Sequence, residues 1–218
     1  VTGVCNPQQE SNASLSRLMI GAEPPTLQRV AHTAGSAVMV VKGLSLPRED
    51  QFGVDLNDIH LQVCAGEVVG IAGVSGNGQK ELLYALSGED VRARRGSIRM
   101  QGDGGELDVS HMHPGRRRKM GLHFVPEERL GRGAVPTLSL AQNLLLTRTE
   151  SIVLPRFAGG WIRVRQLQAH AARLITRFKV KANGPGAAAR SLSGGNLQKF
   201  IVGREIDANP RLLIVSQP

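Results

Sequence analysis

The sequence predicts an α/β fold, and three observations support this prediction. Short apolar runs, each bounded by Gly, Pro or Asp, follow one another along residues 38–71, which is typical of β-strands. A glycine-rich turn then leads into a stretch with helical periodicity. Residues 138–180 lose the strand pattern and become helical. We therefore expect a mixed β-sheet core with an inserted helical subdomain.

The strands are expected where apolar residues cluster between turn-forming residues. Near the end of the chain, Asn209 and Pro210 precede an uninterrupted apolar run, residues 212–215. Such a run is typical of a buried parallel strand, so we place it at the centre of the sheet. The expected strands cover residues 38–41, 59–63, 68–71 and 212–215.

Two helical segments have a clear apolar face. After Gly78, the side chains of Leu82, Leu83 and Leu86 share one face of a helix. The inserted subdomain, about residues 136–192, shows a similar pattern with arginines on its other faces. Its apolar face is expected to consist of Leu167, Ala171, Leu174, Ile175 and Phe178.

The two ends of the chain indicate how it is organised. Residues 1–36 are rich in Asn, Gln, Ser, Pro and Thr, which predicts a linker with one or two helical turns. The folded domain is expected over residues 37–218. The chain starts with Val1 rather than Met and stops at Pro218, directly after an apolar run. We therefore expect a fragment of a longer protein.

Composition narrows the class of protein. With 41% hydrophobic residues, the chain is expected to be a folded globular protein. No apolar run approaches the length of about 20 residues that is needed to span a bilayer, and the N-terminus lacks the basic-then-apolar pattern of a signal peptide. We therefore expect a cytoplasmic location. Cys5 and Cys64 lack metal-ligand spacing, which favours reduced thiols without a disulfide or zinc.

The strong positive charge has several possible meanings. A formal charge of +9 is compatible with nucleic acid, an anionic membrane surface or a phosphate-rich ligand. Aromatic residues make up only 3% of the chain, which argues against a protein that binds single-stranded nucleic acid by stacking aromatic side chains on the bases. We expect a solvated basic face, formed by Arg92, Arg94, Arg95, Arg99, Arg116, Arg117, Arg118 and Lys119.

A glycine loop, Gly73-Val74-Ser75-Gly76-Asn77-Gly78, lies between the third expected strand and the following helix. Its spacing fits a Walker A loop, in which backbone N–H groups and a helix N-terminus surround phosphate oxygens. A functional loop continues with Lys and then Ser or Thr, but this chain has Gln79 and Lys80 there. Lys80 is displaced by one residue, a rotation of about 100° on a helix, so it is not expected to replace the missing lysine.

We therefore expect weak nucleotide binding at most from this loop. The alternative is a purely structural turn between strand and helix. The residues expected to contact a nucleotide here are Gly73, Gly76, Asn77, Gly78, Gln79 and Lys80.

A second glycine motif, Leu192-Ser193-Gly194-Gly195-Asn196-Leu197-Gln198-Lys199, is predicted to begin a helix. It resembles the ABC signature sequence, with Asn196 in place of the usual Gln. The hydroxyl of Ser193 and the amides of Gly194 and Gly195 are expected at the positive end of the helix, where they can contact an anion. The alternative is that Ser193 simply caps the helix.

The run at residues 212–215 occupies the place of a Walker B strand, which normally ends in Asp-Glu-Pro. Here Ser216 and Gln217 precede Pro218. The missing Asp ordinarily assists magnesium, and the missing Glu orients or deprotonates the attacking water, whereas Ser and Gln are neutral. We therefore expect no intact catalytic residue, with Gln79, Ser216 and Gln217 at the degenerate positions, and no metal site.

Two further residues occupy positions that have a role in nucleotide-binding domains. Glu127 takes the glutamine position of a Q-loop, which suggests a coupling role, although a solvated loop is the alternative. Phe52 lies where an adenine-stacking aromatic residue is found, although a lone Phe before a strand can also belong to the core. The three histidines without a metal pattern, expected to be surface or packing residues, are His111, His113 and His123.

Taken in order, these motifs resemble the C-terminal ATPase domain of simple-sugar and nucleoside ABC importers, over residues 37–218. The stretch Val74–Gln79 is closer to the nucleoside branch. Residues 1–4 and 15–21 resemble the end of a first nucleotide-binding domain in the same polypeptide. The resemblance implies a P-loop NTPase core, here cut after the Walker B strand.

In this family two domains pair head to tail. The resemblance thus implies that Ser193–Asn196 completes the ATP site of the preceding domain, while the site on Gly73–Gln79 is weak. It also implies ATP and Mg²⁺ in the intact protein, membrane-spanning permease subunits, indirectly a solute-binding protein, and a peripheral position on the cytoplasmic face of the membrane. The alternative is a non-catalytic scaffold or regulatory domain, and a nucleic-acid partner is not expected.

Overall fold

The computed structural model describes residues 33–74, 76–148 and 161–217, with a few positions among residues 5–18. The chain divides into two units, residues 1–33 and 34–218. In the first unit Ser14, Leu15, Arg17 and Leu18 are helical, which agrees with the expected helical turn. Of the residues 1–4 and 15–21 that resemble a preceding domain, 1–4, 16 and 19–21 lie outside the described residues, as do Ser75 and Pro218.

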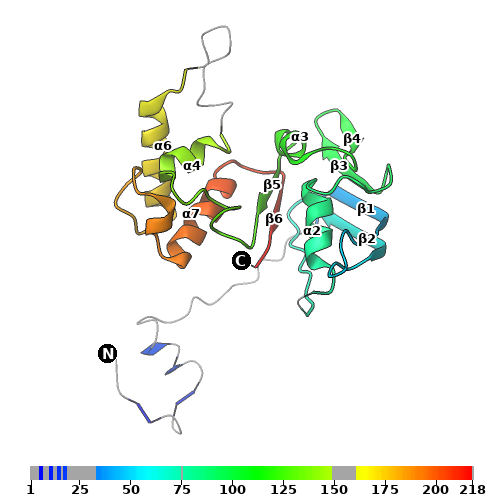
Figure 1. Ribbon diagram of the computed structural model, residues 1–218, viewed down its shortest axis with the longest axis horizontal. Helices are drawn as coiled ribbons and strands as arrows, with labels where there is room; N and C mark the ends of the chain where they lie inside the picture. The colour runs from blue at the N-terminus through cyan, green and yellow to red at the C-terminus, as the bar shows by residue number, and fades with distance from the viewer. Residues whose placement is uncertain are drawn as a thin grey trace. The chain divides into compact units, whose positions relative to one another are not determined.

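Residues 34–218 contain a four-stranded antiparallel sheet in the order β2-β1-β3-β4 (Figure 1). The first two strands confirm the expectation, and the last two form a hairpin that the apolar pattern did not reveal. Met39 pairs with both Val63 and Met100, so β1 lies inside the sheet. The strands are β1 (Ala37–Leu46), β2 (Leu56–Cys64), β3 (Ile98–Gly102) and β4 (Gly105–Asp108).

Helix α2 (Gln79–Ser87) begins directly after Gly78, as expected. Its buried residues Ala85 and Leu86 belong to the same hydrophobic core as Met39 and Ile98 of the antiparallel sheet. This core therefore fixes the helix whose first residue ends the glycine loop.

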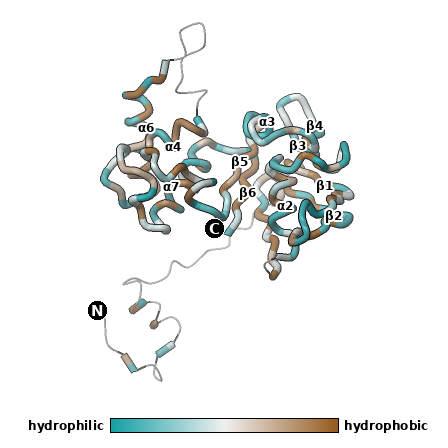
Figure 2. The backbone as a smooth tube through the Cα atoms, viewed as in Figure 1, coloured by the Kyte–Doolittle hydropathy of each residue, from teal (hydrophilic) through white to brown (hydrophobic). Residues whose placement is uncertain are grey.

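A separate two-stranded parallel sheet consists of β5 (Leu122–Val125) and β6 (Leu212–Val215). The parallel pairing of β6 was expected, and Figure 2 shows the hydrophobic residues along both strands. The buried central position was wrong, because every residue of β6 is half-buried. Within the described residues β6 pairs with β5 alone.

The strand expected at residues 68–71 is also wrong. Residues 67–74 have no regular structure, and Val68 is 97% exposed and Ile71 55% exposed. A parallel strand needs a hydrogen-bonded neighbour. None of the described strands pairs with this segment, and a cavity separates it from β6.

The helical part has a core of its own. Leu167, Ala171 and Leu174 are buried as predicted, whereas Ile175 is only partly buried and Phe178 follows the last residue of the helix. Ser139 begins α4 with a capping box, in which its side chain and that of Gln142 bond each other's backbone N–H. The elements are α4 (Leu140–Leu145), α6 (Val164–Arg177), the 3₁₀ turn η3 (Ala189–Ser191) and α7 (Gly194–Ile206).

The predicted solvated basic face is wrong at Arg117, which lies on the short helix α3 (Pro114–Lys119) and is fully buried. Its guanidinium donates to four backbone carbonyls, those of Ala85, Leu86, Ser110 and Met112. Two of these belong to the last turn of α2, where carbonyls lack helical partners. Burial lowers the pKa of Arg117 to about 10, so it stays charged at neutral pH.

Candidate functional site

The glycine loop is shaped by residues in the left-handed region of backbone space. Gly76 has φ 88° and Gly78 has φ 93°, a conformation that favours glycine. Gly78 is the N-cap of α2 and supplies no side-chain cap. The first amides of α2 therefore lack a capping side chain, as in a loop that can accept an anion.

The side chain of Gln79 folds back into this loop. Its Nε2 donates to the carbonyl of Val74 at 3.0 Å, and its Oε1 accepts from the N–H of Asn77 at 3.1 Å. The carboxamide thus bonds two backbone groups on opposite sides of the turn. One of the loop amides is already engaged by the protein itself.

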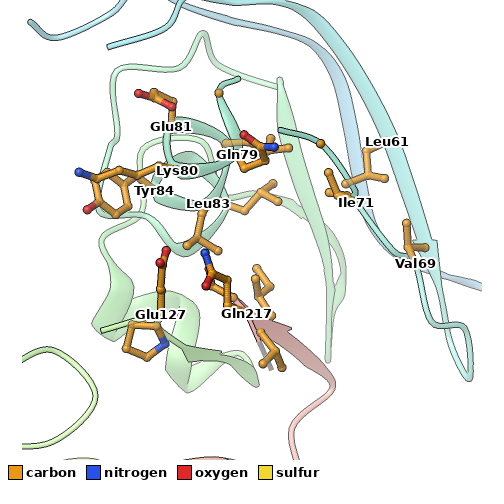
Figure 3. Close-up of a pocket in the computed structure, with 18 of the residues that line it drawn as sticks. Leu61, Val69, Ile71, Gln79, Lys80, Glu81, Leu83, Tyr84, Glu127 and Gln217 are labelled. Carbon is orange, nitrogen blue, oxygen red and sulfur yellow. The ribbon is translucent and has the colours of Figure 1, made fainter. Parts of the chain in front are cut away.

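Lys80 turns away from the loop. Its Nζ lies 5.6 Å from the centre of the Tyr84 ring, and Figure 3 shows the two side chains together on one side of α2. Glu81 accepts from the N–H of Val54 at 3.4 Å. Among the described side chains of the loop and the first turn of α2, none directs a cation toward the glycine amides.

A cavity of about 1130 Å³ lies between α2, the segment before the loop and β6. Glu127 and Gln217 both line this cavity, and Figure 3 shows their side chains directed toward α2. The predicted site residues that it brings together are Phe52, Gly73, Gly76, Gly78, Gln79, Lys80, Glu127, Ser216 and Gln217.

Phe52 is 86% exposed, so the alternative of a core phenylalanine is wrong. The carboxylate of Asp50 accepts from the N–H groups of Phe52 and Gly53, each at 2.8 Å, and this turn presents the ring at the cavity. Beyond β6, the N–H of Ser216 donates to the carbonyl of Val125 at 3.0 Å. The positions after β6 supply only neutral side chains.

The second glycine motif lies elsewhere on the surface. Ser193, Gly194 and Gly195 are exposed and line no part of the cavity. Ser193 occupies the N-cap position of α7, but its side chain makes no cap hydrogen bond. Instead its Oγ accepts from Asn196 Nδ2 at 2.9 Å, while Asn196 Oδ1 accepts from the N–H of Lys181 at 2.8 Å.

The loop after β5 contains Arg129 and Arg132, whose contacts the sequence did not predict. Arg129 Nε donates to Gln198 Oε1 on α7 at 2.6 Å, and a side chain added at Gly194 would lie 3.2 Å from the Arg129 guanidinium. Arg132 stacks 4.8 Å from the centre of the Tyr84 ring on α2 and pairs with Glu89. These pairs join residues up to 69 positions apart in sequence, which no local pattern reveals.

The C-terminal end of α7 is held by a buried ionic cluster. Burial alone would raise the pKa of Glu205, but the His123 hydrogen bond and the charges of Arg204 and Arg118 hold it at about 2. Arg204 also donates to the carbonyl of Gly133 at 3.0 Å. The cluster therefore ties α7 both to β5, through His123, and to the loop that follows it.

The sequence model of the family described as ABC transporter matches residues 56–218. The chain belongs to the ABC transporter family. Its P-loop NTPase fold agrees with a solved nucleotide-free ATP-binding cassette from an ABC transporter, which is 19% identical with a TM-score of 0.63. That match covers 84% of this chain and 70% of the cassette.

Curated ABC relatives extend the comparison. The chain is 34% identical over 210 residues to the nucleoside import ATP-binding protein NupA of Lactococcus lactis subsp. cremoris, covering 96% of this chain and 40% of that protein. It is 32% identical over 213 residues to the ribose import ATP-binding protein RbsA 1 of Streptomyces avermitilis, covering 97% and 38%. The chain thus spans about two fifths of the length of these relatives.

No helix in the described ranges is both long and apolar enough to cross a membrane. The described part of the chain also contains no group of three or more His, Cys, Asp or Glu side chains placed to hold a metal ion. His111 is exposed, and its ring forms a hydrogen bond with the carbonyl of Ala93 at 2.8 Å.

Proposed function

We propose that this chain is the second, degenerate nucleotide-binding domain of the ATP-binding subunit of an ABC importer. The subunit would couple ATP binding and hydrolysis to the uptake of a simple sugar or nucleoside, as the names of the ribose and nucleoside relatives indicate for those proteins. The observation that carries the degenerate assignment is the neutral carboxamide of Gln79 in the lysine position, turned into the glycine loop. Ser216 and Gln217 support it, because neither can replace a catalytic carboxylate.

The second glycine motif supports a role in trans. Ser193, Gly194 and Gly195 are exposed and lie outside the cavity, so they remain accessible to another nucleotide-binding domain. The hydroxyl of Ser193 and the first amides of α7 would contact the γ-phosphate of ATP held by the preceding domain of the same polypeptide. ATP and Mg²⁺ would therefore act mainly at that other composite site.

The coupling role of Glu127 is supported by its neighbours. Arg129 contacts the signature helix α7, and Arg132 contacts α2 through Tyr84 and Glu89. The loop that carries Glu127 thus contacts both α2 and α7, the two helices that begin at glycine motifs. A shift of this loop would be passed to both helices.

The remaining partners follow from this assignment. Membrane-spanning permease subunits would receive the movement of the Glu127 loop on the cytoplasmic face of the membrane, and a solute-binding protein would act indirectly. Nucleic acid is not a proposed partner, because aromatic stacking residues make up only 3% of the chain.

The proposal is tested by ATPase measurements on purified residues 1–218 and on the longer polypeptide that contains them. The short form should show no magnesium-dependent turnover above background, and the longer form should hydrolyse ATP. Robust turnover by residues 1–218 would contradict the degenerate assignment. Full activity of the longer form with Ser193→Arg would instead favour a scaffold or regulatory domain.

A further inference from the structure

We infer that the side chain of Gln79 occupies the glycine loop and blocks phosphate groups from binding there. This is in addition to leaving the loop without a lysine. The inference rests on the proposed function, since it treats Gly73–Gly78 as a nucleotide loop. It makes Gln79 the residue that decides whether an anion can enter.

The carboxamide bonds both kinds of backbone group. Its Oε1 accepts from the N–H of Asn77 at 3.1 Å, as a phosphate oxygen would. Its Nε2 donates to the carbonyl of Val74 at 3.0 Å on the other side of the loop. A neutral side chain of the protein thus satisfies a donor that a nucleotide would need.

The first glycine of the loop lies directly beside this side chain. A Cβ atom at Gly73 would collide with the Nε2 of Gln79, so the first glycine of the motif leaves room for the carboxamide. Gly76 and Gly78, both at positive φ, shape the turn that precedes Gln79. A phosphate would have to displace Gln79 and break both hydrogen bonds before reaching Asn77.

The chemistry of the side chain explains why other residues would behave differently. A lysine could donate to Val74 but could not accept from Asn77, so it would leave that amide free. A methionine has nearly the same length but forms neither strong hydrogen bond. An alanine removes both the hydrogen bonds and the volume. These three replacements separate the effects of charge, hydrogen bonding and space.

The test uses the full polypeptide and a local readout, hydrogen exchange of residues 73–79 followed by mass spectrometry. In the unmodified protein the Asn77 amide should exchange slowly, and inorganic pyrophosphate should add little protection. In Gln79→Ala and Gln79→Lys the amide should exchange faster without ligand. Pyrophosphate should then protect the loop at concentrations at least about tenfold lower than in the unmodified protein. A tenfold change corresponds to about 1.4 kcal/mol, which is the size expected for the loss of two weak neutral hydrogen bonds.

Gln101→Lys is the matched control, because it adds the same charge at an exposed position on β3. It should leave exchange and pyrophosphate protection at residues 73–79 unchanged. The inference is overturned if Asn77 exchanges as fast in the unmodified protein as in Gln79→Met, or if Gln79→Ala gains no pyrophosphate protection. Failure of the proposed function is read separately, as full ATPase activity with Ser193→Arg.

Discussion

Replacement of Glu205 by Gln tests how helix α7 is held in place. The Glu205 side chain is fully buried, and its carboxylate contacts Arg118, Arg204 and the ring of His123. Gln has nearly the same shape but no charge. Arg204, which is only 4% exposed, would therefore lose its counter-ion while remaining buried.

The pKa of Glu205 sets the size of the effect. Burial acts to raise it, yet the contacts with His123, Arg204 and Arg118 hold it at about 2 against the ordinary 4.5. This difference corresponds to roughly 3 kcal/mol of favourable interaction with the charged form. Breaking a buried ion pair typically costs about 3–5 kcal/mol. We therefore expect Glu205→Gln to lower the free energy of unfolding by about 3 kcal/mol, measured by urea denaturation.

The matched control is Glu106→Gln, which breaks the exposed pair between Glu106 and Arg99 at 3.4 Å and should cost less than about 1 kcal/mol. Equal effects of the two replacements would refute the reasoning. The contribution of Glu205 also has a defined pH dependence, because its pKa is lower in the folded state. It is fully present above about pH 4.5 and is lost as the pH falls toward 2, so Glu205→Gln should flatten the acid limb of a stability-against-pH curve.

The remaining predictions concern the proposed ATPase cycle. Ser193→Arg or Gly194→Asp should lower the ATPase rate of the full polypeptide by on the order of 10²- to 10³-fold, whereas Gln79→Ala and Lys80→Ala should leave most of it. If Gln79→Ala were as damaging as Ser193→Arg, both composite sites would have to be catalytic. Glu127→Ala should lower solute uptake into vesicles while ATP binding stays nearly unchanged, and parallel losses of both would make Glu127 a nucleotide contact.

Much of the fold followed from local patterns in the sequence. Short apolar runs bounded by turn-forming residues located β1 and β2, helical periodicity located α6, and the positions of Gly78 and Ser193 marked the starts of α2 and α7. These features are encoded within a few residues of each other. The segment at 68–71 failed because a strand also needs a neighbouring strand, which its own composition does not supply.

The sequence predicted where the glycine loop lies in the chain, but not how its side chains are arranged. Glycine spacing placed the loop, but the inward fold of Gln79 depends on the backbone of Val74 and Asn77. The burial of Arg117 could not be seen either, because a basic run usually indicates solvent exposure. Two of its carbonyl partners, Ala85 and Leu86, lie on α2, more than 30 residues away in sequence.

The unpaired segment before the glycine loop has a practical consequence for work on residues 1–218. Val68 and Ile71 expose large apolar side chains, and within the described residues β6 offers an open edge beside the cavity. An unpaired β-edge next to exposed apolar side chains is a template for strand addition between molecules. Preparations of this polypeptide should therefore be checked for self-association by light scattering, because aggregates would lower apparent activity without any change in the nucleotide loop.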